Sequence, residues 1–551
     1  TKWTNLQLTS IMTKQASKYF RLWFGSVLIF GNLFFGCNET ASQYQKNQVF
    51  RYNEHKNIGS LDPAFAKDNA DISAINQLFN GLVQMNPIMD VTPAIASSWE
   101  ISENAKVYTF QLRTDVFFHT HALFGPEKTR NVTANDFVFS FDRLRDPKLA
   151  SPGAWVLQNV ESYKALNTHS FQITLKTPFP AFLGLLTMKY CSVVPKEIVE
   201  HYSADFRSNP IGTGPFKFKR WEENIKLIFR KNENYFETDK SGEKLPHMEA
   251  VAITFLADKQ SEFLQFVQGN IDYITGLDAS YKDDILRADG VLKQSYTSTV
   301  KMLRAPYLNT EYLGFYMDSE LPEYQSELIR QAVNYGFDRV KMMKYLRNGI
   351  GIPAIGGFIP KGLPGHNEGA GYDYQPERAK QLLETYRNES GNSEPEIILT
   401  TTSNYLSFSE FIQRELQSIG LTIRIEVLPP SSLKSAKANG KIDLFRASWV
   451  ADYPDAQNYL SLFYSGNFAP NGPNYTHFKN EQFDALYEQA MLETNQEKRI
   501  NLYQKMDSLV IHKAPVVVLF YDEVIRFTSI DIEGLGINPT NLLELKNVRK
   551  N

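Results

Sequence analysis

The stretch between residues 397 and 427 limits the fold of this chain more than any other. Residues 397–400 (Ile-Ile-Leu-Thr) form a candidate strand, a helix-like pattern follows, and Gly420 ends it before residues 421–427 alternate at the strand period. The apolar residues of that helix share one face: Phe408, Phe411, Ile412, Leu416 and Ile419. Two strands joined through a helix form a β-α-β unit. The stretch therefore predicts an α/β fold.

The next strand of this layer is expected at residues 442–447. It leads into Trp449 and Asp452, and residues 453–455 form a Tyr-Pro-Asp turn. Ligands of open α/β sheets bind beyond the carboxyl ends of the strands, which makes Asp452 a candidate ligand contact. Asp and Pro are also ordinary turn residues, so the spacing alone leaves a plain exposed turn as the alternative.

Other elements are predicted along the chain by the same periodicities. Strands are expected at residues 48–53, 107–113, 171–175 and 515–520, the last of them buried. A helical pattern covers residues 326–347 and ends at an Asn-Gly pair.

Length and composition indicate a large soluble protein. A chain of 551 residues exceeds what one hydrophobic core supports, so two or three domains are expected. A net charge of -3 excludes the basic surface that nucleic-acid binding needs. With only two cysteines, Cys37 and Cys191, the chain has neither a disulfide framework nor a multi-cysteine zinc site. Cys191 is expected to be a small buried apolar residue.

The amino-terminal region has the pattern of an export signal. Basic residues between positions 14 and 21 precede an apolar run at residues 22–30, which is short for a membrane-spanning helix. Cys37 follows a glycine in a stretch that resembles a bacterial lipobox, which implies that Cys37 becomes lipid-modified. Residues 38–47 are polar, as a tether would be. A plain signal anchor is the alternative, and Met12 is a sensible translation start.

Enzymatic and metal chemistry find little support in the sequence. The pair His119 and His121 has the spacing of one strand face and lacks a nearby third ligand, so we expect no metal site and no cofactor. Neither a Gly-x-Ser-x-Gly nor a His-Glu-x-x-His motif occurs. Residues 212–215, Gly-Thr-Gly-Pro, lack the Lys-Ser/Thr of a phosphate loop and instead suit a crossover between lobes.

Several short stretches, each weak alone, combine into a family resemblance that covers nearly the whole mature chain. They are residues 59–63 (GSLDP), 79–83 (FNGLV), 93–96 (PAIA), 108–113 (YTFQLR), 133–138 (TANDFV), 212–216 (GTGPF) and 449–455 (WVADYPD). Their order and spacing resemble the periplasmic solute-binding proteins of ABC transporters, in the oligopeptide, dipeptide and nickel group called family 5. The chain departs from the family pattern after His119 and at Ala456.

The resemblance implies an α/β fold of two lobes that close on a ligand, the Venus-flytrap or type II periplasmic binding protein architecture, with an additional inserted domain near the amino end. The implied division is a signal peptide at 1–37, a tether at 38–47, lobe I at 48–90, 212–305 and 515–551, the inserted domain at 91–211, and lobe II at 306–514.

The resemblance also implies a ligand site. Asp452 matches the aspartate that accepts a peptide's α-ammonium group, and Trp449 matches the aromatic residue beside the ligand. Main-chain groups around Asn57 and Ile58, and around Val450, would hold the peptide backbone as a strand does. A buried ammonium is costly unless paired, which makes the role of Asp452 chemically coherent.

These features together predict a monomeric extracytoplasmic lipoprotein, anchored through Cys37, that passes peptides to an ABC permease in the membrane and has no catalytic activity. The sequence does not place a partner for the ligand's carboxylate, and Arg304 and Arg446 are candidates only. The same fold could instead bind a nickel chelate, haem or an oligosaccharide. A cell-surface hydrolase is the alternative from another class of protein.

Overall fold

A computed structural model of the chain describes residues 48–278 and 280–551. The predicted signal peptide, the tether and Cys37 lie outside the described residues. Among the helices that are described, none is both long and apolar enough to span a bilayer.

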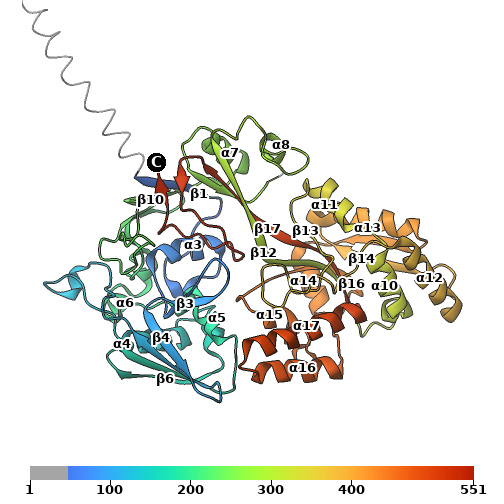
Figure 1. Cartoon of the computed structure of the whole chain (residues 1–551), viewed down its shortest axis with the longest axis horizontal. Coiled ribbons are helices and arrows are strands. Elements are labelled where there is room, and N and C mark those ends of the chain that lie inside the picture. Colours follow the sequence, from blue (N-terminus) through green and yellow to red (C-terminus); the bar gives the residue numbers. More distant parts are fainter. Residues whose placement is uncertain (1–47, 279) are drawn as a thin grey trace, which may run out of the picture.

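One mixed sheet of eleven strands runs through the molecule (Figure 1). Its order is β15-β14-β16-β12-β17-β11-β1-β10-β9-β8, and β13 pairs with β17. The strands are β1 (Val49–Glu54), β8 (Phe216–Glu222), β9 (Lys226–Lys231), β10 (Ala250–Phe255), β11 (Tyr273–Thr275), β12 (Val300–Phe315), β13 (Ile352–Pro353), β14 (Glu396–Thr401), β15 (Thr422–Val427), β16 (Leu444–Val450) and β17 (Val516–Ser529).

Two long antiparallel strands, β12 and β17, connect the two ends of this sheet (Figure 1). The first part of β12 pairs with the part of β17 that adjoins β11, and the second part lies between β17 and β16. The register breaks between Pro306 and Thr310. A bulge of this kind bends a strand and increases its twist. A second register break lies between Glu311 and Tyr312, so the chain between the two halves is continuous but irregular at two points.

The β-α-β unit predicted from residues 397–427 is confirmed. β14 and β15 pair in parallel from Glu396↔Thr422 to Thr401↔Val427, and α13 (Leu406–Ser418) connects them. β16 joins the opposite side of β14 in parallel through Thr400↔Phe445. The turn at residues 451–455 thus follows the carboxyl end of a central strand.

A separate antiparallel sheet, ordered β4-β5-β7-β6, lies within the amino-terminal half (Figure 1). The remaining strands are β2 (Val83–Met85), β3 (Val91–Pro93), β4 (Ala96–Ile101), β5 (Val107–Leu112), β6 (Val160–Asn167), β7 (Ser170–Leu175), β18 (Ile532–Glu533) and β19 (Arg549–Lys550). The strands predicted at residues 48–53, 107–113 and 171–175 are therefore confirmed. The one predicted at residues 515–520 is also confirmed, but β17 continues for nine residues beyond it to Ser529.

The helical pattern at residues 326–347 is two helices and not one. The first ends at Tyr335, and Asp338 begins the second by accepting a hydrogen bond from the Lys341 N–H. A β-carbon at Gly336 would lie 2.6–2.7 Å from the side chains of Leu416 and Ile419. The prediction of one helix was wrong because an N-cap and a close contact with α13 interrupt a continuous apolar periodicity.

The helices cover the sheets and build the outer layers of both halves (Figure 1). They are α3 (Asn69–Leu78), α4 (Ala134–Arg145), α5 (Phe182–Leu186), α6 (Lys196–Tyr202), α7 (Lys259–Val267), α8 (Lys282–Ile285), α9 (Pro322–Gln325), α10 (Glu327–Tyr335), α11 (Arg339–Arg347), α12 (Pro376–Ser390), α14 (Pro430–Ala438), α15 (Gln457–Leu460), α16 (Glu481–Leu492) and α17 (Gln496–Lys513).

Separate hydrophobic cores occupy the two halves. The largest takes most of its residues from between Phe50 and Tyr273, together with the carboxyl-terminal segment from Ile532 to Val548. Two others lie around the β14–β16 region and its helices. The last residues of the chain thus return to the half that contains the first strand. This arrangement leaves room between the halves for a site that both can line.

Candidate ligand-binding site

A cavity of about 180 Å³ lies between the two halves. A single water needs only about 10–15 Å³ of such space, so the cavity can hold a small organic molecule. Its walls come from α3, the β2 region, the short helix at Lys189–Cys191, Tyr307 and Leu308 of β12, the turn after β16, and the carboxyl-terminal segment at residues 540–546. Polar side chains line much of it: Asn69, Ser73, Asn76, Gln77, Asn80, Gln84 and Asn541.

The turn after β16 brings Asp452 to this cavity. Asn458 at the start of α15 holds the turn, because its Oδ1 accepts hydrogen bonds from the Trp449 indole (2.8 Å) and from the Asp452 N–H (3.2 Å). The Nδ2 of Asn458 lies 3.4 Å from a carboxylate oxygen of Asp452. One buried amide thus sets the position of both residues.

Asp452 offers an unpaired carboxylate to the cavity. Solvent reaches its side chain, yet the surrounding walls raise the pKa of the carboxyl, an effect that the hydrogen bond from Asn458 opposes in part. No lysine, arginine or histidine among the described residues forms an ion pair with Asp452. A carboxylate that is crowded but unpaired is suited to receive a cationic group from a ligand.

The carboxylate of Asp455, three residues further on, already has partners within the protein. Its carboxylate accepts the Gln457 N–H at 2.8 Å and lies 4.0 Å from the Arg499 guanidinium. Asp455 is therefore a structural residue of the turn, and Asp452 is the carboxylate that remains available.

A group of charged residues lies at another wall of the cavity. Lys546 pairs with Glu237 (2.7 Å) and Glu544 (3.6 Å) and donates a hydrogen bond to Gln84 (3.1 Å). Lys189 also lines the cavity but makes neither an ion pair nor a hydrogen bond with its side chain in the described part of the chain. The cavity thus contains one unpaired anion and one unpaired cation.

The other predicted contacts are placed differently. The Val450 side chain lines the cavity, whereas Trp449 does not and acts on Asp452 through Asn458. Asn57 is exposed and Ile58 is buried, and neither lines the cavity.

Neither arginine that was considered for the ligand's carboxylate lines the cavity. Arg304 pairs with Glu523. Arg446 pairs with the buried Glu311 and stacks on the Tyr405 ring, with 3.3 Å between the guanidinium carbon and the ring centroid. Both guanidinium groups thus already have carboxylate partners within the protein.

Sequence reasoning missed most of the cavity wall, including Lys189, Tyr307 and the segment at residues 540–546. The reason is that these stretches are far apart in the chain and share no periodicity or motif. Other wall residues, such as Asn80, Ala94 and Pro215, belong to stretches that carry the family resemblance, but among the residues predicted to contact the ligand only Asp452 and Val450 line the cavity.

His119 and His121 do not form a metal pair. Both ring nitrogens of the buried His119 are engaged by the main chain, Nδ1 by the Gly212 N–H at 3.2 Å and Nε2 by the Gly214 carbonyl at 3.0 Å. His121 contacts the Tyr202 hydroxyl at 3.1 Å instead. Cys191 is buried, as expected, and burial raises the pKa of its thiol to about 12.

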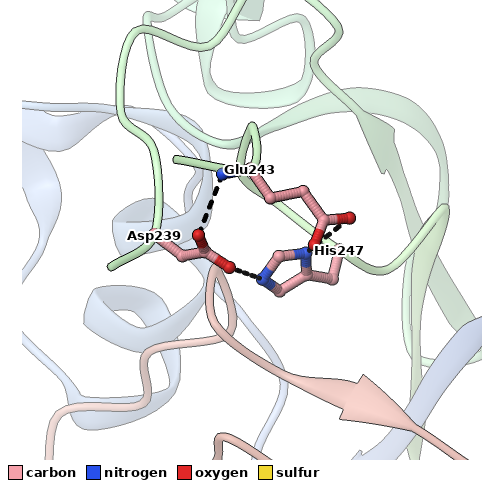
Figure 2. A group of neighbouring side chains, drawn as sticks. All are labelled: Asp239, Glu243 and His247. Carbon is pink, nitrogen blue, oxygen red and sulfur yellow. Dashed lines mark hydrogen bonds and ion pairs between the residues drawn. The ribbon is translucent and has the colours of Figure 1, made fainter. Parts of the chain in front are cut away.

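A different cluster has the composition of a metal site. Figure 2 shows Asp239, Glu243 and His247 turned toward one another on a single loop. A nitrogen of the Arg549 guanidinium lies 2.8 Å from Asp239, 2.7 Å from Glu243 and 3.1 Å from His247. This arginine already supplies the positive charge that a metal ion would bring. The cluster is therefore an ion-pair network that attaches the carboxyl-terminal strand to the loop.

Comparisons with known proteins agree on the family. The model of the bacterial extracellular solute-binding proteins, family 5 Middle, matches residues 90–471, more than half of the chain. Heme-binding protein A of Haemophilus influenzae is 27% identical over 524 residues, covering 91% of this chain and 92% of that protein. The dipeptide-binding protein of Escherichia coli K12 is 24% identical over 493 residues, covering 86% and 88%.

A solved structure shows the same fold. HbpA2 from Haemophilus parasuis superposes with a TM-score of 0.80 at 23% identity, over 91% of this chain and all of that one. The fold class expected from the sequence, a two-lobed periplasmic binding protein, is confirmed. Because the family model matches more than half of its residues, this chain belongs to the family 5 bacterial extracellular solute-binding proteins.

Proposed function

We propose that this protein is the extracytoplasmic binding component of an ABC importer, which captures peptides between two lobes and delivers them to a membrane permease. The observation that carries the proposal is the unpaired carboxylate of Asp452 in a cavity between the two halves. A free peptide brings an α-ammonium group, which is the cation that such a carboxylate can pair. The dipeptide-binding name of one relative supports the same ligand class.

The chemistry of the cavity suits a peptide backbone. Amide and hydroxyl side chains on α3 and the carboxyl-terminal segment offer both donors and acceptors, which a peptide's own amides require. Val450 and Leu308 add apolar contact area on the opposite wall. Water can bridge the remaining polar groups, so that ligands with different side chains fit one site.

The two halves would close on the ligand by rotating about a hinge. In our proposal lobe I comprises residues 48–90, 212–305 and 515–551, lobe II comprises 306–514, and residues 91–211 form the inserted domain. The register break between Pro306 and Thr310 of β12 lies beside the cavity, where Tyr307 and Leu308 line it. Bending at this point would change the separation of the walls.

Export, anchoring and assembly complete the proposal. The lipobox-like stretch supports lipid modification of Cys37, and the polar residues 38–47 would then tether the folded protein to a membrane. We propose that it acts as a monomer whose partner is the permease.

Haem is the second candidate ligand, because a relative at 27% identity is named a heme-binding protein. The two candidates differ in charge chemistry. Binding of a peptide requires the α-ammonium to reach Asp452, whereas haem carries two carboxylates and no ammonium. Nickel chelates and oligosaccharides are further alternatives within the same fold.

The experiment is calorimetric titration of the purified mature protein with one panel: di- to pentapeptides, haem, a nickel–histidine chelate and an oligosaccharide. The proposal predicts that peptides bind and leave the protein unchanged. Mass spectrometry of the recovered peptides checks for cleavage, which would instead support a hydrolase. Tight binding of haem with no binding of any peptide would contradict the proposal.

A further inference from the structure

The hairpin of β2 and β3 ends in a turn whose shape is fixed by Asn86. The Oδ1 of Asn86 accepts the N–H groups of Ile88 (3.0 Å) and Asp90 (2.9 Å), and its main-chain carbonyl accepts the Met89 N–H at 3.0 Å. Two neighbouring side chains of this turn differ sharply in burial: Ile88 is 75% exposed and Met89 only 7%. The turn therefore holds Met89 in one fixed direction, away from solvent.

Met89 is buried in the core of the opposite half. The hairpin belongs to the amino-terminal half, whose core contains Val83 of β2. Met89, however, belongs to the core built around β16 and α17, together with Ala456 and Tyr503. Its φ of 70° lies in the left-handed region, which is unfavourable for a residue with a side chain. Such a conformation persists where surrounding contacts stabilise it, and here those contacts come from the opposite half.

Tyr453 makes the reciprocal exchange. It follows Asp452 in the turn after β16, yet it belongs to the amino-terminal core and is only 9% exposed. Its ring lies edge-on against the ring of Phe179, with 6.2 Å between the two centroids. Each half thus contributes one large side chain to the core of the other, Met89 in one direction and Tyr453 in the other.

A second cavity, of about 290 Å³, lies between the two halves beside Met89 and the residues that follow Tyr453. One half lines it with Met85, Met89, Trp99 and Leu183, and the other with Pro454, Ala456, Ile500 and Tyr503. Side chains therefore fill the contact between the halves only in part. Because a gap removes dispersion contacts from the groups that line it, this contact is weaker than a continuous core and can open.

We propose that Met89 and Tyr453 form an interlobe latch, which populates the closed arrangement of the two lobes before any ligand is bound. Burial of the two side chains favours closure, and the partly filled contact keeps closure reversible, so that open and closed molecules coexist. Since Tyr453 directly follows Asp452, opening of the latch also moves the cavity wall that carries this carboxylate. The closed arrangement is thus a pre-existing state that a ligand can select.

The test measures the distance between the two halves in the unliganded protein. Spin labels are attached through Glu103→Cys, exposed in the β4–β5 turn, and Gln489→Cys, exposed on α16. Cys191 is buried and escapes labelling, and Cys37→Ser removes the remaining thiol. Double electron–electron resonance then gives the populations of short and long distances in the full chain.

We expect the labelled protein to show both populations. Met89→Ala should decrease the ratio of closed to open molecules by about 10-fold or more, as for a truncated buried methionine. Phe179→Ala, which removes the ring against which Tyr453 packs, should act in the same direction. Met89→Leu conserves the apolar volume and should retain the original ratio. Ile88→Ala changes the exposed neighbour in the same turn and is the matched control.

Thermal unfolding of each variant separates the latch from a purely structural role. If Met89 served only the stability of its core, Met89→Ala would unfold at a lower temperature and its distances would not change. That result, or an unliganded protein without a closed population, would contradict the latch. Phe179 is only partly buried, so Phe179→Ala tests the latch even if Met89→Ala does not fold. The proposed function fails separately, in titrations with peptides, because this experiment contains none.

Discussion

At the scale of single residues, the site depends on the side-chain amide of Asn458, which joins the end of β16 to the turn that carries Asp452. Asn458 binds the indole of Trp449 and both the main chain and the carboxylate of Asp452. It acts through these residues and is a positioning residue. Trp449, which the family resemblance places beside the ligand, donates a hydrogen bond to the same amide oxygen that accepts the Asp452 N–H.

We predict that Asn458→Ala weakens peptide binding by about 10-fold, since one hydrogen bond to a charged group is lost. The hydrogen bond from Asn458 lowers the pKa of Asp452, so its removal should raise that pKa further. Only the charged carboxylate pairs an ammonium. The acid side of the curve of affinity against pH should therefore move to higher pH, which titrations between pH 4 and 8 measure. The exposed Asn404→Ala is the control, and an unmoved curve in Asn458→Ala would refute the positioning role.

Asp507 is a buried residue outside the site whose charge affects stability. Burial raises the pKa of its carboxyl to about 7, although the main-chain N–H groups of Phe358 and Ile359 oppose the shift. Between about pH 4 and pH 7 the unfolded chain carries this charge and the folded protein does not. Folding is then progressively disfavoured as pH rises, by up to roughly 4 kcal/mol at pH 7 and above.

We therefore predict that Asp507→Asn removes this pH dependence. The unfolding free energy of the variant relative to wild type should increase from pH 4 to pH 7, because only the wild type loses stability through this group. Denaturant unfolding at several pH values measures the difference, with the exposed Asp284→Asn as the control. A difference that stays constant across this range would contradict the prediction.

The sequence could identify Asp452 because it follows a recognisable strand and belongs to a stretch with a family pattern. It could not identify Lys189, whose neighbours Met188 and Tyr190 form no motif. The unpaired state of a lysine depends on which carboxylates come near in space. Here the charged groups that act on Lys189, Glu544 and Lys546, lie more than 350 positions away in the chain.

At the scale of elements, the Gly-Thr-Gly-Pro stretch at residues 212–215 supports one helix end. A β-carbon on Gly214 would lie 2.4 Å from the main-chain carbon of Leu78, and one on Gly212 would lie 2.1 Å from the Leu78 oxygen. The Thr213 hydroxyl donates to Asn80. The stretch was expected to be a crossover between lobes, and that role stays a prediction. It leads into β8, and its glycines are needed because the chain passes directly over the end of α3.

We predict that Gly214→Ala destabilises the protein by about 1–3 kcal/mol, because the added methyl group meets main-chain atoms that cannot rotate away. Since α3 lines the cavity, peptide affinity should fall as well. Chemical denaturation and titration measure the two effects. Gly536→Ala is the matched control, because a β-carbon there has no neighbour within 4 Å. Equal stability of the two variants would contradict the predicted contact.

Local patterns predicted the β-α-β unit and several strands correctly, since each of these has a clear periodicity. The strand β12 was not predicted, because Pro306 interrupts it and both faces of its second part are buried, which removes the alternation. The division of residues 326–347 into two helices was also missed, since Asp338 looks like any polar residue of a helix until its cap is seen.

At the scale of the whole molecule, separate cores lie on either side of the cavity, and the paired strands β12 and β17 run between the two ends of the main sheet. Only the closed state would let a ligand touch both walls tightly, so ligand binding should favour closure through its higher affinity for that state. We predict that a saturating peptide decreases the radius of gyration measured by small-angle X-ray scattering. A radius that stays constant at saturation, established by calorimetry on the same sample, would contradict hinge closure.

The central claim is that Asp452 receives the α-ammonium of a peptide. The most direct measurement is a cycle of four titrations, in which wild type and Asp452→Asn each bind one peptide with a free and with an N-acetylated amino terminus; Asp284→Asn serves as the control. Removing one partner of a buried charge pair costs roughly 3–5 kcal/mol. Acetylation should therefore weaken binding to the wild type by about 100-fold or more and change little in Asp452→Asn. Equal affinity of the wild type for the free and the acetylated peptide would contradict the account.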